Sequence, residues 1–83
     1  MLDTIVLETA LKHGISETSI LQAWDNFASK RPRSNDCWVC IGFDNEGTEI
    51  EMVGLETADL QILIIHAMSP ATEKIRRELG IAR

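Results

Sequence analysis

The sequence predicts an α+β fold with two N-terminal helices, a three-stranded antiparallel sheet and a C-terminal helix. Apolar residues recur at helical spacing within the first 28 positions, two later segments resemble strands joined by a turn, and a Ser-Pro step precedes a last helical pattern. A chain of 83 residues has room for one hydrophobic core. We therefore expect a single domain, residues 1–83.

The first positions favour a helix. Apolar residues at positions 6, 7, 10 and 11 recur at helical spacing, which predicts a helix from about residue 4 to His13. Gly14 can end it in the left-handed conformation. The β-branched residues of Thr4–Val6 also fit a strand, but we favour the helix.

The next segment carries stronger helix signals. Ser16 is a suitable N-cap, and Ile15 can pack against Ile20 as a hydrophobic staple. Apolar side chains then recur on one face through position 28, and they include Trp24 and Phe27. We expect this helix to lie on the sheet, with both aromatic rings in the core.

Three strands are expected to follow. Cys37–Phe43 and Thr48–Leu55 are predicted to form a hairpin through the turn Asp44–Gly47, whose Asn and Gly tolerate positive φ. Leu60–Ala67 is apolar on both faces, which predicts a central or doubly covered strand.

The last helix is predicted to begin at Ser69 and Pro70, as N-cap and first helical residue, and to end at Gly80. Its predicted buried stripe consists of Ala71, Ile75 and Leu79.

Composition excludes several classes of protein. The hydrophobic fraction of 45% and the charged fraction of 25% are typical of globular domains, not of disordered or collagen-like chains. The longest near-apolar run, Leu60–Met68, is far shorter than the ~20 residues that span a bilayer. Because no export segment is recognisable, we expect a cytoplasmic protein with no membrane partner and with reduced cysteines.

The net charge of −5 opposes nucleic-acid binding by the chain as a whole, but the charges are segregated. No Lys or Arg occurs between Ser34 and Glu73, and six of the eight basic residues form two clusters. These clusters are Lys30, Arg31 and Arg33, and Lys74, Arg76 and Arg77. They can form one local cationic patch, or they can be solvated side chains that balance nearby acids.

Cys37 and Cys40 do not predict a metal or redox site. Residues three apart on a strand point to opposite faces, and no second cysteine pair or suitably spaced histidine pair completes a tetrahedral site. We therefore expect no metal and no cofactor.

Two segments resemble the BrnT-like toxins of the RelE-type ribonuclease group. Ala10–Ser16, with the letters ALKHGIS, is similar to the opening "KHG(V/I)S" of that family, and Ile64–Arg77 is similar to its closing strand and basic helix. The expected order of elements is also that of the family. The resemblance implies the toxin of a type II toxin–antitoxin pair, which cleaves RNA and is neutralised by an antitoxin protein.

Metal-independent RNA cleavage needs a base, an acid and a cation near the phosphate. His66 is the candidate for proton transfer because it ends the last strand shortly before the basic helix, and Arg76 and Arg77 are the candidate catalytic cations. The alternatives are a hydrogen-bonded structural role for His66 and pairing of the arginines with Glu73 and Glu78.

Four further basic residues are predicted to hold the RNA backbone, and these are Lys30, Arg31, Arg33 and Lys74. His13 is expected to interact with the end of the first helix. Trp38 is compatible with core packing, with base stacking or with a protein contact.

The alternative function is a non-catalytic module that binds a partner protein or a second copy of itself. The acidity of the chain favours this alternative, whereas the histidine beside a basic helix favours RNA cleavage. We take RNA cleavage as the expected function.

Overall fold

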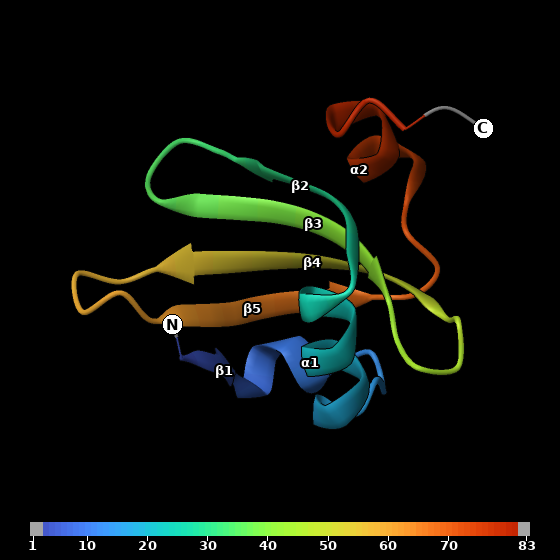
Figure 1. Ribbon diagram of the computed structural model, residues 1–83, viewed down its shortest axis with the longest axis horizontal. Coiled ribbons are helices and arrows are strands. Elements are labelled where there is room, and N and C mark those ends of the chain that lie inside the picture. Colours follow the sequence, from blue (N-terminus) through green and yellow to red (C-terminus); the bar gives the residue numbers. More distant parts are fainter. Residues whose placement is uncertain (1–2, 82–83) are drawn as a thin grey trace.

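The computed structural model describes residues 3–81 and contains one five-stranded sheet with helices on both faces (Figure 1). The elements in chain order are β1 (Thr4–Val6), the 3₁₀ helix η1 (Glu8–Leu11), α1 (Glu17–Asp25), β2 (Phe27–Pro32), β3 (Cys37–Phe43), β4 (Glu49–Glu56), β5 (Ile62–Met68) and α2 (Glu73–Glu78). The strand order is β1-β5-β4-β3-β2. All neighbouring strands are antiparallel except β1 and β5, which are parallel.

The predicted fold class is wrong in its sheet and in its N-terminal helices. The sheet is mixed and has five strands, because two segments expected to be helix or loop pair with its edges. Thr4–Val6 pairs with Ile62–Ile64, so the β-branched start forms a strand instead of a helical turn. The predicted first helix is reduced to the single turn of η1.

The second predicted helix is correct at its start and wrong at its end. Ser16 caps α1, since its Oγ accepts a hydrogen bond from the backbone N–H of Ser19 at 3.1 Å. The helix ends when Asn26 adopts φ −101° and ψ 58°, and the chain turns into β2. Phe27 is consequently 51% exposed and is not a core residue, whereas Trp24 is buried as predicted.

The central strands follow the prediction closely. β3 has the predicted bounds, β4 is displaced by one residue, and β5 lies between β1 and β4 as expected of an apolar central strand. Leu60 lies outside β5, in a turn with φ 61°, and is 60% exposed. In the β3–β4 turn, only Gly47 of the two expected residues has a positive φ, of 82°.

The two faces of the sheet are covered differently. The face packed against α1, called here the α1 face, carries the main apolar cluster, which is Ala10, Ile20, Ala23, Trp24, Cys40, Ile50, Met52, Ile62, Ile64 and Ala67. The opposite α2 face carries a smaller cluster, which is Val39, Ile41, Ala71, Ile75 and Leu79. The predicted buried stripe of the last helix is therefore confirmed.

The start of α2 differs from the prediction. The Ser69–Pro70 peptide bond is cis, and the N-cap is Thr72, whose Oγ1 accepts a hydrogen bond from the N–H of Ile75 at 3.4 Å. Ser69 instead donates its hydroxyl hydrogen to the carbonyl oxygen of Glu49 at 2.6 Å. Among residues 3–81, no helix is long and apolar enough to cross a membrane.

Candidate functional site

The centre of the candidate site is a hydrogen-bonded histidine–carboxylate pair on the α2 face. His66 on β5 and Glu51 on β4 are joined through Nε2 and Oε2 at 2.7 Å. The Glu51 side chain is 5% exposed, while that of His66 is 30% exposed. The second carboxylate oxygen of Glu51 accepts a hydrogen bond from the N–H of Thr72 at 2.6 Å. Glu51 therefore positions both the imidazole ring and the chain that leads into α2.

The second histidine of the chain lies beside this pair. The ring centroids of His13 and His66 are 5.9 Å apart, and the rings meet edge to face at 80°. The segment carrying His13 is fixed to β5 because Thr9 Oγ1 donates a hydrogen bond to the carbonyl oxygen of Ile65 at 2.9 Å. The expected role of His13 at a helix end is not observed, because the helix there is the short η1, which stops at Leu11.

The carboxylate of Glu51 remains ionised in this setting. Burial alone would raise its pKa, but the hydrogen bonds from Thr72 and His66 outweigh burial and lower the pKa. An ionised Glu51 can only accept a hydrogen bond, so His66 carries its proton on Nε2. The Nδ1 atom of His66 is then the ring nitrogen that can accept a proton.

Arg76 does not reach this site as a free cation. Its guanidinium is paired with Glu49, and the two side chains are only 14% and 18% exposed. Glu49 also accepts a hydrogen bond from the N–H of Ala71 at 3.1 Å. Arg76 thus holds the segment after β5 against β4 through Glu49, whereas the alternative considered from the sequence was a pair with Glu73 or Glu78.

Arg77 and Lys74 lie on the solvent side of α2. Arg77 donates a hydrogen bond to Glu73 at 3.0 Å, but its side chain is 78% exposed, so the guanidinium remains accessible. Lys74 is exposed as well. Glu78, which was expected to pair with an arginine of α2, instead binds Arg33 through both of its oxygens at 2.6 and 2.7 Å.

The predicted basic cluster at residues 30–33 is divided between the two faces of the sheet. Lys30 is paired in register with Cys40, a residue of the α1 cluster, so Lys30 lies on the face opposite His66. Arg31 lies near the end of α2, with a guanidinium nitrogen 3.6 Å from the position of a Cβ built on Gly80. The seven predicted site residues therefore do not converge on one patch.

The two cysteines are free thiols and do not belong to the candidate site. Cys37 is half-buried and Cys40 is buried on the α1 face. Burial raises the pKa of Cys40 to about 12, against a smaller opposing effect of Lys30. A buried thiol with such a pKa is a packing residue.

His66 was predicted from the sequence, but both of its neighbours in the site were not. Val53 pairs with His66 across the strands, so Glu51, two residues along β4, is its diagonal neighbour on the same face. A correct strand register would have revealed this contact. His13 could have been found from the fact that each of the two segments resembling the toxins contains one histidine.

The arrangement is suited to metal-independent acid–base chemistry, since one imidazole has a fixed tautomer and the centroid of a second imidazole lies 5.9 Å from it. Comparisons of the chain with known protein families, with curated proteins and with solved structures found no match.

Proposed function

We propose that this protein cleaves RNA without a metal ion, as the toxin of a type II toxin–antitoxin pair. The observation that carries the proposal is the approach of His13 to the His66–Glu51 pair. The two histidines belong to the two segments that resemble BrnT-like toxins, and they are 53 positions apart in the sequence (66 − 13).

In the proposed reaction, His66 Nδ1 accepts the proton of a ribose 2′-hydroxyl. The 2′-oxygen then attacks the adjacent phosphorus, and the bond from phosphorus to the 5′-oxygen breaks. His13 donates a proton to that 5′-oxygen as it leaves. Glu51 is a positioning residue that keeps the proton of His66 on Nε2 and stabilises the charge the ring gains.

The phosphate requires a cation, and the exposed groups of α2 are the candidates. Arg77 presents a planar guanidinium to solvent, and Lys74 lies one turn before it on the same short helix. Arg76, Arg33 and Lys30 are less suited to this role because each is already engaged by a neighbouring group. An RNA substrate and an antitoxin partner imply that the protein acts in the cytoplasm.

The proposal is tested by RNA cleavage with purified protein and by growth during controlled expression in a bacterial host. We expect His66→Gln and His13→Gln each to reduce the cleavage rate by about 10²–10⁴-fold and to relieve growth inhibition. The matched control is Asp59→Asn, an exposed change in the turn before β5, which should leave cleavage unchanged. Intact RNA and normal growth with the unmodified protein would exclude the nuclease.

A second candidate function, a non-catalytic protein-binding module, is favoured by one feature of the α2 face. Ile5, Leu63, Leu55 and Cys37 are paired in register across β1, β5, β4 and β3. They form an apolar row at the end of the face distant from α2, and Ile5 is 40% exposed. In a toxin, the same row would serve as a contact for the antitoxin.

The two functions give different results for one double variant. Under both functions, Ile5→Ser with Leu63→Ser should abolish binding of a partner protein. If the partner is a second copy of the chain, the variant should lose the self-association that sedimentation detects. Only the nuclease proposal predicts that the variant still cleaves RNA. A single-chain mass and no binding partner for the unmodified protein would exclude the binding module.

A further inference from the structure

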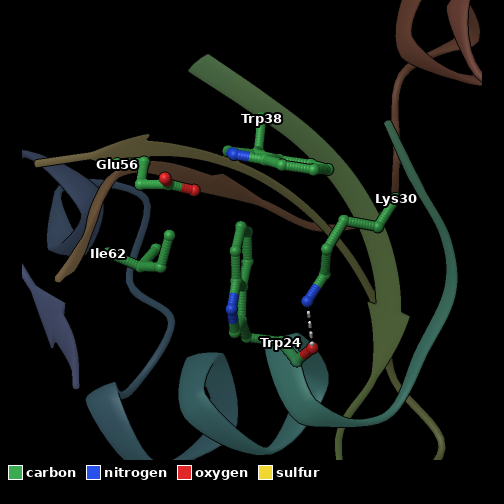
Figure 2. A pocket seen from close by; sticks show the side chains of 5 residues that line it. All are labelled: Trp24, Lys30, Trp38, Glu56 and Ile62. Atoms are coloured by element: carbon green, nitrogen blue, oxygen red, sulfur yellow. Dashed lines mark hydrogen bonds between the residues drawn. The ribbon is translucent and has the colours of Figure 1, made fainter. Parts of the chain in front are cut away.

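The α1 face contains a pocket of about 190 Å³ that is separate from the two histidines. Its lining residues come from five elements and are Trp24, Lys30, Trp38, Glu56 and Ile62. Figure 2 shows Trp38 lying across the pocket above the edge of Trp24, with Glu56 on one side and Lys30 on the other. Two indole surfaces thus lie between groups of opposite charge.

Lys30 is held in place at its side of the pocket. Its ammonium donates a hydrogen bond to the carbonyl oxygen of Trp24 at 3.2 Å and lies 4.0 Å from the centroid of that ring. It also lies 4.3 Å from the centroid of Phe27. An ammonium has three N–H donors, and the carbonyl uses one of them. Lys30 therefore retains donors for a ligand at a fixed position.

The opposite side offers acceptors. Glu56 is half-buried at the end of β4, and no described side chain forms an ion pair or hydrogen bond with its carboxylate. Trp24 can lie close to β4 because Gly54 has no side chain, since a Cβ there would lie 2.8 Å from Cη2 of the indole. The residue at position 54 thus permits the shape of the pocket.

The charges of the lining restrict the ligand. One positive and one negative group line the pocket, so neither a simple cation nor a simple anion is favoured. The volume is below the ~300–1,000 Å³ of pockets for drug-sized molecules, which limits the ligand to one small ring system. Indole surfaces favour a flat ring, as in the stacking of unpaired bases on aromatic side chains.

We propose that this pocket binds one unstacked guanine base. Guanine carries two adjacent N–H donors, at N1 and N2, which match the two oxygens of Glu56. On the other side it carries the acceptors O6 and N7, which match the ammonium of Lys30. Uracil has one N–H between two carbonyl groups and would place a carbonyl oxygen against the carboxylate.

The inference deepens the proposed function, because it names a base of the RNA substrate, but guanine binding does not require cleavage. Ile62 in the pocket and His66 in the candidate site lie four residues apart on β5, about 13 Å along the strand. They lie on opposite faces because the pairing of β4 with β5 shifts between Ile64 and His66. A guanine in the pocket would therefore select the RNA at a distance from the bond that is cleaved.

The test uses the two indole N–H signals in the NMR spectrum of the full chain, since the sequence contains only two tryptophans. We expect guanosine to shift both signals in a saturable manner, and uridine to bind at least about tenfold more weakly. Equal shifts with both nucleosides would overturn guanine recognition. A second ligand, N-acetyltryptophan amide, has a flat ring but lacks the donor and acceptor pattern of guanine. Shifts with this ligand and none with guanosine would also overturn the proposal.

The lining residues provide two variants. Glu56→Gln should raise the Kd for guanosine about tenfold, because it removes a hydrogen bond to a charged group. Trp38→Leu, which keeps an apolar side chain, should weaken binding of guanosine. The circular dichroism spectrum of this variant should match that of the unmodified protein, which would show that the fold is retained. The matched control Glu46→Gln, on the exposed turn after β3, should keep the unmodified Kd.

The source of the guanine and the link to cleavage are tested separately. The RNA dinucleotide GpG should bind more tightly than guanosine if the natural ligand is a guanine within RNA. It should bind no more tightly if the natural ligand is a free nucleoside. Guanosine binding without RNA cleavage would retain the pocket and exclude the nuclease. Cleavage with no guanosine-induced shift would retain the nuclease and exclude the pocket.

Discussion

The two faces of the sheet are held to their helices by different forces. On the α1 face, Ile20, Ala23 and Trp24 pack on buried aliphatic residues of the strands, so apolar packing is dominant. On the α2 face, two carboxylates on β4 hold the segment after β5 through hydrogen bonds, beside a smaller apolar cluster. The face that depends on charge is the one that presents the two histidines. The apolar packing that dominates the α1 face and the hydrogen-bonded carboxylates of the α2 face are thus separated by one sheet.

The largest expected effect is on the α1 face, at Gly42. A Cβ at this position would overlap the backbone carbonyl oxygen of Ala23, so α1 must move away from β3 to accommodate it. We expect Gly42→Ala to lower the free energy of unfolding by about 3 kcal/mol or more, measured by urea denaturation.

The same substitution at Gly47 is the control. Gly47 has a φ of 82° and open space around its missing Cβ, so the cost there is backbone strain alone, of about 1–2 kcal/mol. If Gly42→Ala were no more destabilising than Gly47→Ala, close packing of α1 on β3 would not be the main stabilising contact of this face.

The α2 face should show an intermediate effect that depends on pH. Glu51→Gln should cost about 1–2 kcal/mol at pH 7, since it weakens the hydrogen bonds to His66 and Thr72. The folded-state pKa of Glu51 is lowered, so its contribution is present above the pKa of the unfolded chain. That contribution is lost as the pH falls through the folded-state pKa.

The measurement is the free energy of unfolding between pH 7 and pH 3 for the unmodified chain and for Glu51→Gln. The unmodified chain should lose more stability than the variant over this interval, because the variant has no carboxylate at position 51 to protonate. Equal losses would show that Glu51 does not couple the α2 face to pH.

Local signals in the sequence predicted local structure well. The cap at Ser16, the strand Cys37–Phe43 and the last buried stripe each depend on residues close in the chain, and each is correct. The edge strands β1 and β2 were missed because each is a strand through its pairing with a neighbouring strand, β5 or β3. Thr4–Val6 pairs with residues 58 positions later, and no short-range pattern contains that information.

The candidate site was predictable to the same extent. His66 was found because it lies near the end of an apolar strand, which is a local signal. Its partners Glu51 and His13 are 15 and 53 positions away, so they required the strand register and the position of η1. Local charge spacing also predicted the pair of Arg77 with Glu73 correctly, but it missed the distant pair of Arg33 with Glu78.

The smallest effect on stability is expected at Arg77, together with a separate effect on the rate of the proposed RNA cleavage. Its pair with Glu73 is exposed, so Arg77→Ala and Glu73→Ala should each change the free energy of unfolding by less than about 0.5 kcal/mol. Only Arg77→Ala removes the cation that the proposed reaction places near the phosphate, and it should slow RNA cleavage about tenfold. Glu73→Ala breaks the same pair and leaves the guanidinium in place, so cleavage should persist. Equal rates for the two variants would mean that the charge of Arg77 does not contribute to cleavage.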